Sequence, residues 1–162
     1  MQSEDEKFMK LALREAKKAY DEDEVPVGAV IVKNGKIIAK AHNQKEAKND
    51  TTKHAEITAI QKASKKLNNW RLEETTMYVT LEPCTMCVGA IIGARIKRLC
   101  FGALDEKTGA CGSVLNIPKE YKFNHVVEVE PKIMEKECVD IMQDFFRELR
   151  KKKQTKKRGE NE

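Results

Sequence analysis

The sequence contains no run of about eighteen consecutive apolar residues, so no membrane-spanning helix is expected. Residues 1–7 are acidic and polar, and they lack the basic start and apolar centre of a secretory signal peptide. We therefore expect a protein of the reducing cytoplasm. The 162 residues also contain no internal repeat and no linker, which predicts a single domain.

The number of cysteines is odd, and in a reducing compartment we expect no disulfide between them. Cys100 and Cys138 fall in apolar patterns and are interpreted as small buried side chains. Cys84 and Cys87 form a close pair, which favours a metal site or a catalytic role. Cys111 lies in a glycine-rich stretch and is given no role.

The net charge of +5 is concentrated at the C-terminus. Residues 150–162 hold seven basic and two acidic residues, whereas the other residues hold 24 of each sign. The sequence therefore predicts a folded domain over 1–150 and a basic tail over 151–162. A solvated tail and an arm that binds nucleic acid are equally compatible with this composition.

Helical and strand periodicities alternate along the domain. Ser3 and Glu6 form a capping box ahead of the first apolar periodicity, and Asn34-Gly35 is typical of a type I′ hairpin turn. Helices are expected over 5–21, 54–67 (capped by Thr51 or Thr52), 84–94 and from 133 onward. Strands are expected over 27–32, 36–41, 72–81, 98–103 and 125–129. This order predicts an α/β fold whose five-stranded mixed sheet has helices on both faces, with the third and fourth strands parallel.

The Cys84-x-x-Cys87 pair opens the predicted helix that follows the third strand. Alone, such a pair suits a zinc knuckle, a redox pair or half of a catalytic metal site. His54 begins another predicted helix about thirty residues upstream. Three such ligands leave the fourth tetrahedral position of a zinc ion open to water, as in catalytic zinc sites.

Glu56 lies two residues after His54, where it would sit beside the metal rather than on it. A carboxylate in that position can move protons between water and a substrate. His-x-Glu followed by Pro-Cys-x-x-Cys is the pattern of zinc-dependent nucleobase deaminases. We therefore expect one Zn²⁺ per chain and a catalytic role for Glu56, and a structural zinc or a redox pair is the competing interpretation.

At these residues the sequence resembles the bacterial tRNA-specific adenosine deaminase family of the cytidine deaminase-like superfamily. The resemblance extends over about residues 5–150 and rests on segments 25–29, 80–91, 94–96 and 98–113. It implies a three-layer α/β/α fold, a homodimer, and a zinc-dependent nucleobase deaminase domain over 1–150. The implied reaction converts adenosine to inosine at the wobble position of a tRNA anticodon, through attack of zinc-bound hydroxide at C6 with Glu56 as proton shuttle.

The resemblance also implies roles for three substrate-binding residues. Asn43 matches an asparagine that hydrogen-bonds the flipped base, and Ala55 matches a residue whose main chain contacts that base. Asp105 matches a residue of the substrate loop near the anticodon sugar. For each of them the alternative is ordinary loop or turn chemistry.

Two other functions remain open at this point. One is a guanine or cytosine deaminase that acts on a free base or nucleoside. The other is a non-catalytic zinc module that binds RNA. Glu56 argues against the second, because a structural zinc site does not need a carboxylate beside the metal.

Overall fold

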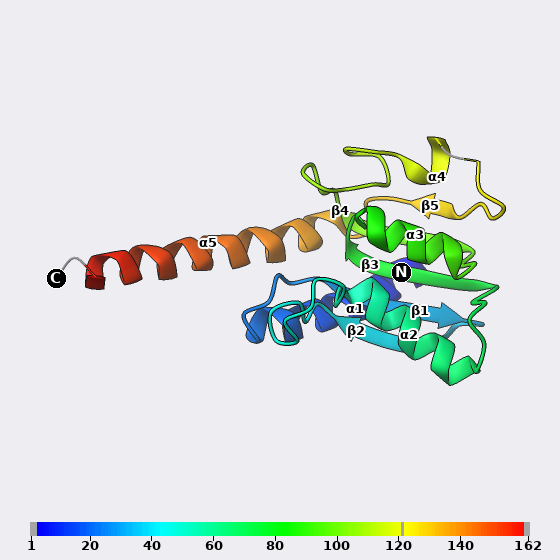
Figure 1. Cartoon of the computed structure of the whole chain (residues 1–162), viewed down its shortest axis with the longest axis horizontal. Helices are drawn as coiled ribbons and strands as arrows, with labels where there is room; N and C mark the ends of the chain where they lie inside the picture. The colour runs from blue at the N-terminus through cyan, green and yellow to red at the C-terminus, as the bar shows by residue number, and fades with distance from the viewer. Residues whose placement is uncertain (1–2, 121, 161–162) are drawn as a thin grey trace.

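The computed structural model describes residues 3–120 and 122–160 of the chain. Its centre is a five-stranded sheet in the order β2-β1-β3-β4-β5, in which β1 is antiparallel to both β2 and β3 whereas β3, β4 and β5 are parallel (Figure 1). The predicted mixed sheet and its parallel third and fourth strands are therefore confirmed. The strands are β1 (Gly28–Lys33), β2 (Lys36–His42), β3 (Thr75–Leu81), β4 (Arg98–Ala103) and β5 (Glu128–Glu130).

Helices cover both faces of this sheet, as the three-layer expectation requires. The helices are α1 (Glu4–Asp21), α2 (Ala55–Leu67), α3 (Thr85–Gly93), α4 (Ile117–Glu120) and α5 (Glu135–Glu160). Alternate side chains of β1 show the layering: Ala29 and Ile31 face the core under α2 and α3, whereas Val30 and Val32 face α1. The start of α5 packs on the α1 side, where Cys138 and Cys100 are both fully buried. Burial raises the pKa of both thiols to about 12, which agrees with their interpretation as small core residues.

The structure confirms two local predictions in the N-terminal part of the chain, the Ser3 side of the capping box and the Asn34-Gly35 turn. Ser3 caps α1, and its side chain accepts a hydrogen bond from the main-chain N–H of Glu6 at 3.1 Å. Asn34 and Gly35 adopt φ values of 51° and 73°, the positive range that a type I′ turn requires at both central positions. The turn fixes the β1–β2 hairpin.

Three local expectations differ from the structure. His54, not Thr51 or Thr52, caps α2, because Asp50 accepts hydrogen bonds from the main chain and hydroxyl of Thr52 and so holds it in the preceding turn. The fifth strand is Glu128–Glu130 rather than 125–129, because these are the residues that pair with β4. The short α4 was not predicted, since four residues carry no helical periodicity.

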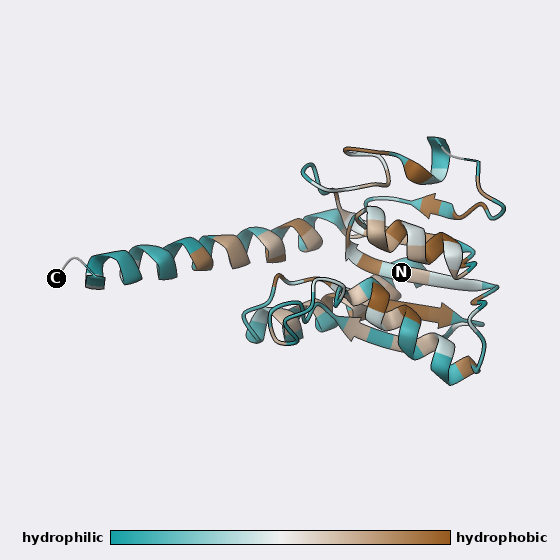
Figure 2. Ribbon diagram, viewed as in Figure 1, coloured by the Kyte–Doolittle hydropathy of each residue, from teal (hydrophilic) through white to brown (hydrophobic). Residues whose placement is uncertain are grey.

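Helix α5 leaves the body and continues as a protruding helix to residue 160 (Figure 1). Its first half packs through Phe145, which is 7% exposed and lies with its ring centroid 5.7 Å from that of Tyr20. Its second half is strongly hydrophilic and contains the described part of the predicted tail (Figure 2). The outermost residues of the predicted domain and tail, 1–2 and 161–162, lie outside the described residues. Among the residues described, no helix is both long and apolar enough to cross a membrane.

A half-buried ionic network joins α1 to the middle of the sheet. Arg98 donates two hydrogen bonds to the two carboxylate oxygens of Asp5, each at 2.7 Å, and the Tyr78 hydroxyl donates a third at 2.7 Å. The hydrogen bonds from Arg98 lower the pKa of Asp5. Because the folded-state pKa is depressed, this stabilisation is present above the unfolded pKa and is lost as the pH falls through the folded value.

We expect Asp5→Asn to lower the free energy of unfolding by about 1–3 kcal/mol at pH 7, because charge-assisted hydrogen bonds to half-buried Arg98 are lost. The difference from wild type should shrink below about pH 4, the unfolded pKa of aspartate. Urea denaturation at several pH values measures both. Asp140→Asn, which removes an exposed ion pair with Lys136, is the matched control and should change stability by less than about 1 kcal/mol. An Asp5→Asn difference that does not vary with pH would contradict the assignment.

Candidate active site

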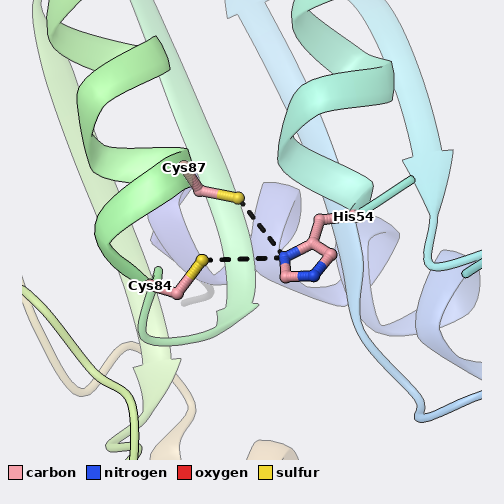
Figure 3. A group of neighbouring side chains, drawn as sticks. All are labelled: His54, Cys84 and Cys87. Atoms are coloured by element: carbon pink, nitrogen blue, oxygen red, sulfur yellow. Dashed lines mark hydrogen bonds between the residues drawn. The ribbon is translucent and has the colours of Figure 1, made fainter. Parts of the chain in front are cut away.

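The site is formed where α2 and α3 begin, next to each other on one face of the sheet (Figure 3). His54 is the N-cap of α2 and Cys84 is the N-cap of α3, and both have extended backbone conformations. Neither side chain makes the usual capping hydrogen bond, so both are available to the space between the helices. Cys87 lies one turn into α3 and is fully buried.

Three side chains of types that bind metals converge in this space. Nδ1 of His54 lies 3.7 Å from Sγ of Cys84 and 3.5 Å from Sγ of Cys87, and all three donor atoms are within 4.8 Å of one another. Tetrahedral zinc, with bonds of roughly 2.1 Å to nitrogen and 2.3 Å to sulfur, places such donors about 3.6 Å apart. The residues therefore fit one zinc ion in both donor type and spacing.

The local electrostatics favour the ionised form of one cysteine. The hydrogen bond from Cys87 lowers the pKa of Cys84 to about 4, and the contact with Cys84 raises the pKa of His54. The same hydrogen bond, together with burial, raises the pKa of Cys87. A thiolate at a helix N-terminus is the form in which cysteine binds metals.

Glu56 lies in the first turn of α2, one residue beyond Ala55, and is 4% exposed. Burial raises the pKa of its carboxyl group. Its side chain reaches the same cavity as His54 and Cys84. The structure thus places Glu56 beside the ligand cluster, as its position in the sequence predicts.

The cavity in front of this cluster has a volume of ≈ 170 Å³. That is smaller than the roughly 300–1,000 Å³ of sites for drug-sized ligands, and it suits a single small ring system. Six of the seven predicted site residues line it, namely Asn43, His54, Ala55, Glu56, Cys84 and Asp105, and Cys87 lies behind them. The remaining lining residues are Val25, Val27, Lys45, Leu81, Glu82 and Thr108.

The three predicted substrate-binding residues differ in how free their side chains are. The Asn43 side chain donates to the Val25 carbonyl and accepts from the main chain of Lys45, both at 3.2 Å, which fixes its orientation in the cavity wall. Ala55 is fully buried. The Asp105 carboxylate accepts two hydrogen bonds from the main chain and one from the hydroxyl of Thr108, and it therefore stabilises its own turn.

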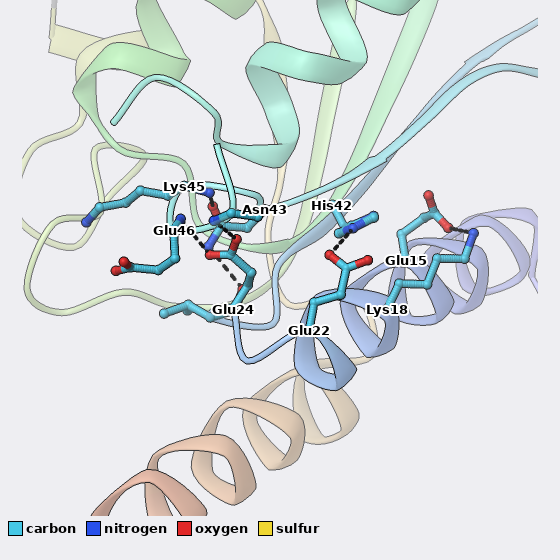
Figure 4. Close-up of polar contacts among 10 residues, drawn as sticks. Glu15, Lys18, Glu22, Glu24, His42, Asn43, Lys45 and Glu46 are labelled. Atoms are coloured by element: carbon cyan, nitrogen blue, oxygen red, sulfur yellow. Dashed lines mark hydrogen bonds and ion pairs between the residues drawn. The ribbon is translucent and has the colours of Figure 1, made fainter. Parts of the chain in front are cut away.

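Two buried glutamates beside the cavity were not predicted. Glu24 is 1% exposed and accepts hydrogen bonds from the main-chain N–H groups of Glu46 (2.9 Å) and Ala47 (2.8 Å), in the loop that follows Asn43 (Figure 4). Glu82, at the end of β3, is 2% exposed and contacts the loop that contains Asp105. An acidic residue directly between apolar Leu81 and a proline is a signal that could have identified it.

Known proteins resemble this chain in both sequence and structure. A family model described as MafB19-like deaminase matches residues 3–150. A protein of Bacillus subtilis (strain 168), named tRNA-specific adenosine deaminase, is 48% identical over 160 residues, which cover 99% of each chain. A solved structure from studies of A-to-I editing by tRNA:A34 deaminases at the wobble position has a TM-score of 0.81 at 45% identity, and covers 83% of this chain and 98% of that one. A solved guanine deaminase from Bacillus subtilis has a TM-score of 0.61 at 34% identity, over 79% and 83% of the two chains.

We expect Cys87→Ala to lose most of the bound zinc, because two ligands hold a zinc ion far less tightly than three. Metal analysis of the purified variant measures the zinc content per chain. Cys138→Ala is the matched control, since it removes an equally buried thiol outside the ligand cluster and should keep wild-type zinc content. Full zinc occupancy in Cys87→Ala would exclude this residue as a ligand.

Proposed function

This chain belongs to the tRNA-specific adenosine deaminases, and we propose that it hydrolyses adenosine to inosine at the wobble position of a tRNA anticodon. The observation that carries the proposal is the arrangement of the small cavity, in which a buried carboxylate stands beside three converging metal ligands. The likeness to the Bacillus subtilis tRNA-specific adenosine deaminase, which extends over almost the full length of both chains, supports the same substrate.

In this proposal one zinc ion per chain is held by His54, Cys84 and Cys87. When bound, zinc supplies a water molecule whose pKa is lowered from about 15.7 to roughly 7, so that hydroxide is available at neutral pH. The remaining chemistry is carried out by the side chains of the cavity.

Glu56 moves the protons of the reaction. It accepts a proton from the attacking water and delivers one to the purine ring nitrogen next to C6. It then assists protonation of the amino group, which leaves C6 as ammonia while the oxygen from water remains as the inosine carbonyl. Adenosine and water are thereby converted to inosine and ammonia, and the carboxylate is restored.

The base is held by other residues that line the cavity with Glu56. The amide of Asn43, whose orientation is fixed by Val25 and Lys45, hydrogen-bonds the flipped base, and the main chain of Ala55 makes a second contact. A base must leave its stack to enter such a cavity, as in other nucleobase deaminases. The turn stabilised by Asp105 then lies near the sugar of the flipped nucleotide.

We also propose that two copies of the chain associate in the cytoplasm, as the family resemblance implies. Support for association comes from apolar side chains exposed just before α4, where Val114 is 54% exposed and Leu115 is 39% exposed. Helix α4, which follows this segment, contacts α3. The protruding part of α5 extends away from the sheet (Figure 1), so association at this segment would leave it free.

The alternative is deamination of free guanine, which the structural likeness to guanine deaminase keeps open. Inosine formation on a transcribed tRNA with adenosine at the wobble position, compared with turnover of free guanine or cytosine, decides between them. We expect inosine on the tRNA and none when the wobble adenosine is replaced by guanosine. Turnover of a free base without any on tRNA would reject the proposal.

One face of α5 continues the surface beside the cavity. Phe146 and Arg150 line a groove against Lys107 of the loop after β4. Lys153 and Lys157 follow Arg150 at positions i+3 and i+7, so they share this face of the helix. We propose that these basic side chains contact phosphates of the tRNA next to the anticodon.

We expect Glu56→Gln to keep zinc and RNA binding but to lose turnover, because an amide cannot move the protons. General acid–base catalysis is typically worth about 10²–10⁴-fold, and here one residue serves several transfers. Single-turnover inosine formation measures the rate. Glu46→Gln, which neutralises an exposed carboxylate of the neighbouring loop, should react like wild type. Near-normal turnover of Glu56→Gln would remove Glu56 from the mechanism.

Deletion of residues 151–162 should weaken tRNA binding and flatten its salt dependence. For single strands the slope of log affinity against log salt changes by about 0.7 for each phosphate contact that is lost. Turnover on saturating tRNA should stay nearly unchanged, because no described residue of the tail lines the cavity. Binding measured at several salt concentrations tests this, and identical slopes for the two proteins would leave the tail as a solvated extension.

A pair of matched variants separates a specific face of α5 from its overall charge. Lys153→Gln with Lys157→Gln removes two charges from the groove side. Lys152→Gln with Lys156→Gln removes two charges from the other side, where Lys152 contacts Asp23 at 2.9 Å. Only the first pair should reduce the salt slope substantially. Equal effects of the two pairs would indicate a diffuse attraction without a defined contact face.

A further inference from the structure

Glu82 is a buried carboxylate that no step of the proposed reaction uses. It follows β3 directly, lies two residues before Cys84 and is 2% exposed. One carboxylate oxygen accepts the main-chain N–H of Asp105 at 3.1 Å and the hydroxyl of Ser113. The other accepts the main-chain N–H groups of Cys111 at 3.0 Å and of Ser113 at 3.1 Å.

These four hydrogen bonds close the segment 105–113 around a single side chain. The fit is tight, since a Cβ atom on Gly109 would lie 2.4 Å from the carboxylate carbon of Glu82. A further hydrogen bond, from the N–H of Ala110 to the carbonyl of Pro83 at 2.9 Å, ties the same segment to the start of α3. The carboxylate therefore acts as the centre around which this loop folds.

The loop held in this way forms one wall of the cavity. Asp105 and Thr108 line the cavity, and Glu82 itself borders it. Among the described residues, Glu82 takes part in no ion pair, so its hydrogen-bond capacity rather than a charge partner holds the wall. A carboxylate offers two acceptor oxygens, whereas the amide of glutamine offers one and adds two donors.

We propose that Glu82 is a positioning residue for the substrate: it fixes the cavity wall that contains Asp105 and Thr108, and it takes no part in the proton transfers. This inference rests on the proposed function, because that wall is expected to meet the sugar of the flipped nucleotide. Loss of one acceptor oxygen leaves buried N–H groups unpaired, and the loop must move to satisfy them with water.

Glu82→Gln tests the assignment through the separation of KM from kcat. We expect the KM for an anticodon stem-loop to rise about tenfold while kcat stays within about threefold of wild type. This pattern is expected when the lost interaction binds the ground state and the transition state equally well. Zinc content should stay at one ion per chain. Hydrogen exchange should show loss of protection at the amides of Asp105, Cys111 and Ser113.

Asp5→Asn is the matched control for a merely structural effect. It also removes an oxygen from a carboxylate that accepts several hydrogen bonds, but at a site outside the cavity. It should lower stability and leave KM unchanged. If Glu82→Gln loses amide protection without any change in KM, or if it loses zinc together with kcat, the positioning role is wrong.

Two additional measurements cover the cases in which Glu82→Gln does not fold or the wild type does not act on RNA. If Glu82→Gln does not fold, Ser113→Ala takes its place: it removes one of the four donors and should raise KM about two- to threefold at constant kcat. An unchanged KM in Ser113→Ala would then overturn the inference. If the wild type deaminates free guanine but no RNA, the proposed function fails; because guanine carries no sugar, loss or retention of amide protection at Asp105, Cys111 and Ser113 in Glu82→Gln then decides whether Glu82 fixes this wall.

Discussion

The site depends on two helices that begin at the same edge of one sheet. The proposed ligands His54 and Cys84 are the N-caps of α2 and α3, and these two helices pack side by side against the same face. A shift of either start by one residue would turn the ligand by about 100° around the helix axis and remove it from the cluster. The parallel β3–α3–β4 crossover fixes the start of α3, and the polar loop after β2 positions the start of α2.

Loops rather than helices or strands form the rest of the site at this edge of the sheet. The main-chain N–H groups of such loops need hydrogen-bond partners from outside regular secondary structure. Here two buried glutamates supply these partners: Glu24 binds main-chain N–H groups of the loop after β2, and Glu82 binds those of the loop after β4. Each carboxylate replaces several main-chain partners that an irregular segment cannot provide for itself. The cavity thus has a rigid floor of helix starts and two walls fixed by hydrogen bonds. The protruding half of α5 adds a basic surface outside this frame.

The parts of the fold that follow from local chemistry could be predicted. The Ser3 cap, the Asn34-Gly35 turn and the apolar periodicities place the main helices and strands within a few residues. Predictions went wrong where local signals compete with distant partners. Thr52 has the chemistry of a helix cap, but Asp50 holds it in a turn, and the fifth strand is limited by the length over which it meets β4.

The sequence by itself determined which residues we propose to carry the chemistry, because the residue types and spacings of His54, Glu56, Cys84 and Cys87 suit few other purposes. It also located the basic tail, since charge is a property of composition. Only the tertiary structure decided that His54, Glu56 and Cys84 border one small cavity with Cys87 behind them, and that the described part of the tail continues α5 as a helix. The tertiary structure alone revealed that Glu82 lies at the centre of a loop. The hydrogen-bond donors around its carboxylate come from residues 23 to 31 positions away in the sequence. Contacts over such separations leave no periodicity or motif in the sequence near Glu82.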